Sequence, residues 1–150
     1  MLDKFIANAV SHWSRVFAVT VDPGLVRAII QRESSGGKFS VTKEPGGRYS
    51  YGPMMVLDST ARGMGVTDPK RLAEPGLGIW YGVRHLAELL QRFQGDVERA
   101  VSAYNTGPAR ANRSGAGTFP NQTYVDAVMG FYRSFRGAAF PALAGIALVA

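Results

Sequence analysis

The chain of 150 residues has no cysteine and two histidines, His12 and His85. Without cysteine it forms neither a disulfide nor a thiolate metal site, and it has no cysteine nucleophile. Two histidines in such a chain do not suggest a histidine-based metal centre. The composition therefore predicts no metal centre, and we expect no cofactor.

Acidic residues are fewer than basic ones. The chain has eleven Asp and Glu and seventeen Lys and Arg, which gives a formal net charge of +6. Such an excess suggests an anionic partner such as nucleic acid, a membrane surface or a cell-wall polymer. The arginines are scattered along the chain, and neither zinc-finger spacing nor an RNA-binding aromatic motif is present. We therefore expect no nucleic-acid partner and interpret most of the charge as solvated surface.

Long uncharged runs are rare in this sequence. The first seventeen residues follow an amphipathic helical pattern and lack the continuous apolar core of a secretory signal. Residues 137–150 carry no charge, but this segment is shorter than the roughly twenty apolar residues that span a bilayer. Two interpretations stay open for it: a packed final helix or loosely ordered apolar tail, or a segment that contacts a membrane or a phage particle.

The remaining pattern predicts one compact, all-α domain over residues 1–136, with the 137–150 tail after it. Asp22 and Pro23 are typical of a helix start, and the apolar residues that follow keep helical spacing as far as Glu33. Gly36 and Gly37 are expected to end this helix. Further helices are predicted over residues 53–63, 78–93, 97–104 and 123–135.

Residues 38–52 lie between two of these helices and are rich in glycine and polar side chains. They predict either a loop or a small β-hairpin that turns at Pro45–Gly47.

Glu33 lies at an unusual place for a carboxylate, at the C-terminal end of the apolar face of its helix. Loss of hydration and the negative end of the helix dipole both favour its protonated form. A raised pKa is what a general acid near neutral pH requires. The alternative is an exposed helix-end acid paired with Arg32 or Lys38.

Four short motifs connect Glu33 to the rest of the chain. Their residues are Glu33-Ser34, Gly52-Pro53-Met54-Met55, the AYNTGP run from Ala103, and Tyr124-Val125 followed by Val128. In this order and spacing they resemble the ES, GLMQ, AYNAGP and YVxxV motifs of the soluble lytic transglycosylase domain in the lysozyme-like superfamily. The resemblance covers about residues 20–133 and implies a lysozyme-like fold.

The resemblance also implies an activity on peptidoglycan glycan strands. Members of that family cleave the β-1,4 bond between N-acetylmuramic acid and N-acetylglucosamine and form 1,6-anhydromuramoyl ends. Glu33 is then the single general acid and base. Two alternatives stay open: a muramidase that hydrolyses the same bond, with Glu44 or Asp58 positioning a water, and a non-catalytic virion or wall-binding protein.

Seven further residues are assigned to substrate binding by the same resemblance. They are Ser34, Thr42, Gly52, Met54, Tyr104, Asn105 and Tyr124. Within this set, Ser34 is expected to fix the turn after Glu33. For Thr42 an ordinary loop position is equally expected, and for Met54 an ordinary core position is the alternative. The polar groups of Tyr104 and Asn105 are expected to point into the cleft near Glu33.

The chain departs from the family pattern at three positions. Pro53 and Met55 replace the leucine and glutamine of GLMQ, and Gly78 stands where an asparagine commonly begins the long helix. An enzyme of this kind must reach the cell wall. We therefore expect it in a phage virion or in the bacterial cell envelope or periplasm.

Overall fold

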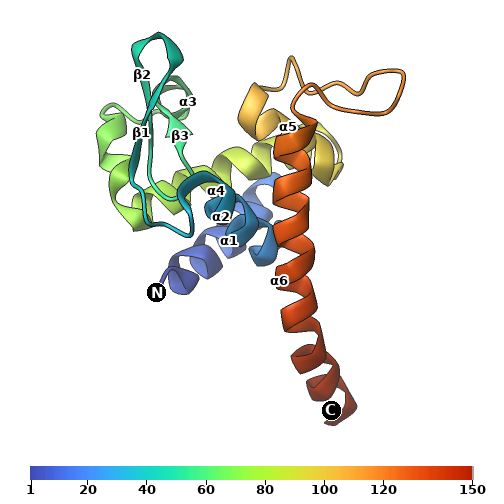
Figure 1. Ribbon diagram of the computed structural model, residues 1–150. Coiled ribbons are helices and arrows are strands. Elements are labelled where there is room, and N and C mark those ends of the chain that lie inside the picture. The colour runs from blue at the N-terminus through green and yellow to red at the C-terminus, as the bar shows by residue number, and fades with distance from the viewer. Residues whose placement is uncertain (150) are drawn as a thin grey trace.

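The computed structural model describes the backbone of residues 1–149 and the side chains of residues 1–136. Helices dominate, as the sequence predicts, and a small antiparallel sheet lies to one side of them (Figure 1). Their order is α1 (Asp3–Phe17), α2 (Pro23–Ser34), β1 (Val41–Glu44), β2 (Arg48–Tyr51), β3 (Val56–Leu57), α3 (Asp58–Gly63), α4 (Pro75–Arg92), α5 (Val97–Thr106) and α6 (Gln122–Val149), with 3-10 turns at Pro45–Gly47 and Pro69–Ala73.

The start of α2 follows from two residues. The Asp22 carboxylate accepts a hydrogen bond from the Gly24 amide at 2.8 Å, and Pro23 occupies the first turn, where its missing N–H costs nothing. The helix ends at Ser34, two residues before the predicted Gly36, because Ser35 already adopts a left-handed conformation with φ 52°. Glu33 is therefore the penultimate residue of α2.

The predicted hairpin is present and turns at Pro45–Gly47. In its register Thr42 faces Ser50, and Glu44 faces Arg48. Directly opposed residues of an antiparallel pair share one face of the sheet, as do residues two apart. These four side chains therefore lie on the same face of the hairpin.

The helix predicted over residues 53–63 is wrong in its first half. Residues 52–55 form a turn in which the Met55 amide donates to the Gly52 carbonyl at 3.0 Å, and β3 follows before α3 begins. Gly52 has φ 84° and Met55 has φ 46°, and neither value is compatible with a right-handed helix. The sheet thus gains a third strand that the sequence pattern does not predict.

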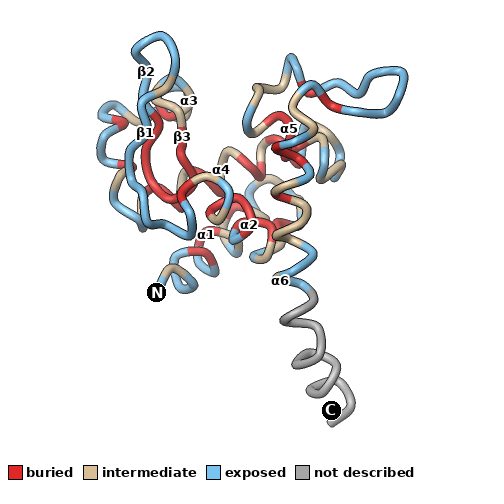
Figure 2. Tube along the Cα trace, viewed as in Figure 1, coloured by how far each residue is buried: buried red, intermediate tan, exposed pale blue. Residues whose placement is uncertain are grey.

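Most of the core lies between the inner faces of α1, α2, α4, α5 and α6, and a smaller cluster joins the sheet to α3. Figure 2 shows these buried stretches, together with the exposed hairpin tip and the exposed connection between α5 and α6. Leu25 and Ile29 of α2 are almost fully buried. Each such side chain contributes roughly 1.5–3 kcal/mol, so the helix that carries Glu33 is firmly held.

Three predicted helix boundaries also differ from the structure. Helix α4 starts at Pro75, α5 extends to Thr106, and α6 continues to Val149 instead of ending near Phe135. The predicted contact of residues 137–150 with a membrane or virion concerns side chains outside the described ones. Along the described chain, no helix is both long and apolar enough to cross a membrane.

Candidate active site

Glu33 is partly buried at the C-terminal end of α2 and is held by one specific contact. The hydroxyl of Tyr124, on α6, donates a hydrogen bond to Oε1 of Glu33 at 2.8 Å. Glu33 forms no ion pair with Arg32 or Lys38 among the described side chains, so the alternative of a paired surface acid is wrong. Because Oε1 already accepts a hydrogen bond, Oε2 is the oxygen left for a ligand.

The environment of Glu33 favours its protonated form. Burial raises the pKa of the carboxyl above its usual value, and the nearby Glu44 raises it further. The hydrogen bond from Tyr124 and the charge of Arg32 lower the pKa without cancelling the effect of burial. The carboxyl therefore retains its proton to a higher pH than an exposed glutamate.

Glu33 borders a cleft with a cavity volume of about 300 Å³. One wall comes from the hairpin and includes Glu44, Arg48 and Ser50, and the other comes from the end of α5, residues 103–108. His85 of α4 lines the same cavity. Figure 1 shows α4 running from the sheet side of the molecule to the α5 side.

Ser34 has no exposed surface, and its hydroxyl stabilises the C-terminal end of α2. Its hydroxyl accepts from the Gly37 amide at 3.0 Å and lies 2.6 Å from the Pro53 carbonyl oxygen, to which it can donate. These contacts agree with the expected role in the turn after Glu33. A substrate contact does not fit this burial, because the side chain cannot touch a ligand in the cleft.

Gly52 allows two backbone segments to approach closely. A Cβ at Gly52 would collide with the Leu72 carbonyl oxygen and would lie 3.1 Å from the Cα of Gly78. A Cβ at Gly78 would strike the same carbonyl oxygen. The absence of a side chain at Gly78 therefore leaves space for the backbone of the Gly52 turn.

The two adjacent methionines take different places in the structure. Met54 is fully buried in the helical core, where its Cβ and Sδ cover Gly82, so the cleft-lining role predicted for it is wrong. Met55 lines the cleft instead. Both Gly52 and Met55 have positive φ, so residues 52–55 form a turn in which Met54 and Met55 point to different surroundings.

Tyr104 and Asn105 both line the cleft, as predicted, but their polar groups have other partners. The Tyr104 hydroxyl donates to the Met54 carbonyl at 2.7 Å, so its proton does not serve Glu33. The Asn105 Oδ1 accepts from Asn121 at 3.0 Å, which turns the amino group of Asn105 toward other acceptors. Asn121 also exchanges hydrogen bonds with Ser102, so it fixes the orientation of Asn105.

Two predicted residues lie outside the cleft surface. Tyr124 is buried and acts on Glu33 rather than on a ligand. Thr42 shares a sheet face with Ser50 but is exposed beyond the residues that line the cavity. The sequence analysis did not predict His85, Arg48 or Asn121 as site residues. For His85 a signal was present, because a histidine beside the apolar stripe of a helix can mark a site.

The geometry agrees with a family relationship. The model of the transglycosylase SLT domain matches residues 17–125. The chain belongs to this family. All the cleft residues named above lie within the matched range, so the SLT domain contains the whole candidate site, while α1 and most of α6 extend beyond it.

Individual relatives of this SLT domain come from a phage and from bacteria. A transglycosylase of Enterobacteria phage PRD1 is 32% identical over 111 residues, which is 71% of this chain and 39% of the relative. Protein IpgF of Shigella sonnei is 31% identical over 90 residues, 58% of this chain and 59% of the relative. The chain thus spans 39% of the phage relative and 59% of IpgF, less than two thirds of each.

A solved structure supports the fold of the SLT domain. An inactive mutant of the lytic transglycosylase Slt from Pseudomonas aeruginosa superposes with a TM-score of 0.65 at 19% identity. The match covers 88% of this chain and 24% of that chain. The lysozyme-like fold predicted from the sequence is therefore confirmed.

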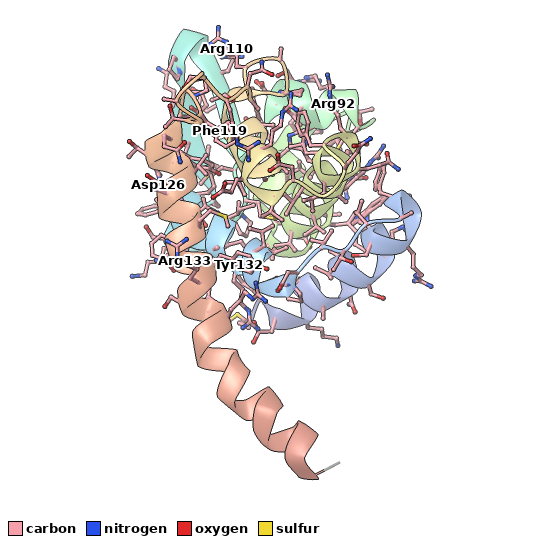
Figure 3. All side chains as sticks on the ribbon, turned by 90° about the vertical axis from the view of Figure 1, so that its right-hand side faces the viewer. Arg92, Arg110, Phe119, Asp126, Tyr132 and Arg133 are labelled. Carbon is pink, nitrogen blue, oxygen red and sulfur yellow. The ribbon has the colours of Figure 1, made fainter. Side chains whose placement is uncertain are left out.

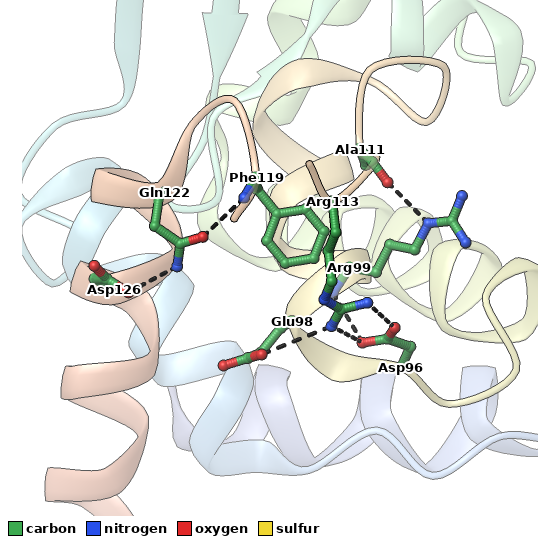
Figure 4. Close-up of polar contacts among 8 residues, drawn as sticks. All are labelled: Asp96, Glu98, Arg99, Ala111, Arg113, Phe119, Gln122 and Asp126. Atoms are coloured by element: carbon green, nitrogen blue, oxygen red, sulfur yellow. Dashed lines mark hydrogen bonds and ion pairs between the residues drawn. The ribbon is translucent and has the colours of Figure 1, made fainter. Parts of the chain in front are cut away.

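The connection between α5 and α6 carries Asn121 and is anchored by arginines. Arg113 makes two hydrogen bonds to Asp96, at 2.7 and 3.0 Å, and its guanidinium lies over the ring of Phe119 (Figure 4). Arg99 donates to the Ala111 carbonyl at 2.8 Å in the same network. This SLT domain therefore holds its long α5–α6 connection, and Asn121 with it, in a defined conformation.

Proposed function

We propose that this SLT domain is a peptidoglycan lytic transglycosylase that cleaves the β-1,4 bond between N-acetylmuramic acid and N-acetylglucosamine. The observation that carries the proposal is Glu33, a carboxyl with a raised pKa that borders the cleft and has one oxygen held by Tyr124. The family match and the phage relative named as a transglycosylase support the same activity.

The first step is the protonation of the leaving group. Neutral Glu33 donates the proton on Oε2 to the glycosidic oxygen, the bond from that oxygen to C1 breaks, and the leaving sugar takes the proton as a hydroxyl. The substrate's own acetamido group stabilises the cationic centre, so a second carboxylate is not required. This places the enzyme among the exceptions to the two-carboxylate scheme.

The second step returns the proton to Glu33. Its carboxylate accepts the proton of the muramoyl 6-hydroxyl while that oxygen bonds to C1, which closes the 1,6-anhydro ring. No water is consumed. The test is mass spectrometry of purified peptidoglycan digested by the protein: we expect anhydro ends, and new reducing ends alone would contradict this product.

Glu44 gives a specific reason to keep hydrolysis as a second candidate. It lies on the hairpin wall of the same cleft and is near enough to affect the pKa of Glu33. In that case water attacks C1 while Glu44 accepts a water proton. Glu44→Gln would then abolish reducing ends, whereas a transglycosylase would keep forming anhydro ends after the same substitution.

The context of the activity is a phage particle or the bacterial envelope. The relative from phage PRD1 and the IpgF relatives from Shigella support such a setting. The formal charge of +6 would hold the protein near anionic wall polymers. Binding to isolated walls should therefore weaken as salt rises from about 0.05 to 0.5 M, because ions screen exposed charges. Binding that does not depend on salt would contradict this part.

A further inference from the structure

His85 lines the cleft that contains Glu33, yet the two-step reaction above assigns it no role. Its ring lies 5.2 Å from the ring of Tyr104, at 47° to it. The Tyr104 hydroxyl is in turn bonded to the Met54 carbonyl. The imidazole therefore packs against a side chain that is itself fixed, which limits its freedom in the cleft.

Neither nitrogen of His85 has a hydrogen-bond partner among the described side chains and backbone. In the described part of the chain, the fully enclosed side-chain polar atoms without a partner are Trp13 Nε1 and Arg84 Nε, and neither ring nitrogen of His85 is among them. The ring nitrogens therefore keep some exposed surface, on a side chain that lines the cleft. Since partly buried polar groups usually find partners, a ligand in the cleft is the natural partner here.

The charge state of His85 restricts the chemistry of that ligand. Burial lowers the pKa of the imidazole to about 4, so the ring is neutral at physiological pH. The charged groups that share the cleft are Glu33, Glu44 and Arg48, and burial is the cause of the lowered pKa of His85. A neutral imidazole offers one N–H donor and one nitrogen acceptor. It suits an uncharged group that also carries one donor and one acceptor.

We propose that His85 is a substrate-binding residue that hydrogen-bonds an acetamido group of the glycan in the cleft. A secondary amide presents one N–H and one carbonyl oxygen, and one of them can pair with one ring nitrogen: the N–H with the bare nitrogen, or the carbonyl oxygen with the ring N–H. Nearby Asn105, with its Oδ1 occupied by Asn121, offers a further N–H donor. The inference rests on the proposed function only in taking an N-acetylated glycan as the ligand.

Binding measurements without turnover separate this inference from the proposed function. The probe is a pentamer of N-acetylglucosamine, titrated by calorimetry into the full chain carrying Glu33→Gln. The same background then receives His85→Phe, which removes both polar atoms, or His85→Gln, which keeps a donor and an acceptor. The matched control ligand is a β-1,4-linked pentamer of glucose, which has hydroxyls where the N-acetylglucosamine pentamer has acetamido groups.

We expect His85→Phe to weaken binding of the N-acetylated pentamer about five- to tenfold, as for the loss of a hydrogen bond of ordinary strength, and His85→Gln to restore most of it. Binding of the glucose pentamer should be weaker in the parent and should change little. Equal affinity of the parent and His85→Phe for the N-acetylated probe would overturn the proposal. Equal losses for both probes, or no binding of the N-acetylated probe by the parent at millimolar concentration, would overturn it as well.

The outcomes remain distinguishable from a failure of the proposed function. If wild-type protein leaves peptidoglycan uncleaved while the binding pattern is as expected, the reaction is wrong and the acetamido site stands. If cleavage occurs and the binding pattern fails, His85 has no such role. Circular dichroism and the melting temperature of each variant establish that the compared proteins are folded.

Discussion

The Tyr124 hydroxyl donates a 2.8 Å hydrogen bond to Oε1 of Glu33, which joins α6 to the end of α2 across 91 residues of sequence. A second phenol makes the matching contact at the other end of α2, where Tyr132 donates to the capping Asp22, also at 2.8 Å. Figure 3 shows Tyr132 on the side of α6 that faces the N-terminal helices. Two tyrosines of one helix thus hold both ends of the helix that carries Glu33.

Replacing Tyr124 by phenylalanine should change the pH dependence of cleavage. In the proposed reaction cleavage begins from protonated Glu33, so kcat/KM should fall as pH rises through the pKa of this carboxyl. The hydrogen bond from Tyr124 lowers that pKa, and its loss raises it. We therefore expect the alkaline limb of the kcat/KM profile to move to higher pH in Tyr124→Phe.

Tyr132→Phe is the control for this experiment, because it removes an equivalent hydroxyl from the same helix. Its partner is Asp22, which does not line the cleft. The variant should lose about 1 kcal/mol of unfolding free energy and keep the parent's pH profile. An alkaline limb that stays in place in Tyr124→Phe would show that this contact does not tune Glu33.

Glu33→Gln should stabilise the protein at neutral pH. The raised pKa means that the folded state binds a proton more tightly than the unfolded state, so stability falls as pH rises from the unfolded pKa through the folded one. Glutamine has no charge to desolvate, and its side-chain oxygen still accepts from Tyr124. We expect a melting temperature roughly 2–4 °C higher at pH 7, as for a gain of about 1 kcal/mol.

The gain should disappear in acid, where Glu33 is protonated in both the folded and the unfolded chain. Melting curves at pH 7 and near pH 3 are the measurement. A variant that is less stable than the parent at pH 7 would contradict the destabilising burial of the carboxylate.

Two helical glycines test the close approach behind the cleft. A Cβ at Gly78 would strike the Leu72 carbonyl oxygen, whereas a Cβ at Gly63 meets nothing within 4 Å. Gly78→Ala should cost about 1–3 kcal/mol through overpacking, and Gly63→Ala should be neutral or stabilise by about 0.5–1 kcal/mol. Urea unfolding of both variants measures these differences. Similar free energies for Gly78→Ala and Gly63→Ala would show that the Gly52 turn adapts without cost.

Local signals in the sequence were sufficient for most of the helical frame. The Asp22–Pro23 start, the apolar stripe that leads to Glu33 and the turn at Pro45–Gly47 are each determined by neighbouring residues, and the structure has all three. The motif order was sufficient to predict the fold. The helix start, the apolar stripe and the turn depend on short-range chemistry, whereas the lysozyme-like fold was implied by the resemblance of the motifs to a known family.

The features that sequence reasoning missed depend on contacts between distant segments. The turn that buries Met54 and exposes Met55 to the cleft requires left-handed backbone at Met55, a conformation that methionine itself does not suggest. The packing of Gly52 on Gly78 and the contact of His85 with Tyr104 appear only when helices and sheet are assembled. Helical periodicity cannot distinguish such positions from ordinary ones.

The central claim is that Glu33 alone moves the proton in both steps of cleavage. The most direct measurement is the rate of product formation from purified peptidoglycan by wild-type protein and Glu33→Gln, with soluble products identified by mass spectrometry. We predict anhydro-ended products from the wild type and a rate at least about a hundredfold lower from a folded Glu33→Gln protein, in line with the usual contribution of general acid–base catalysis. Equal rates from the two proteins would contradict the account.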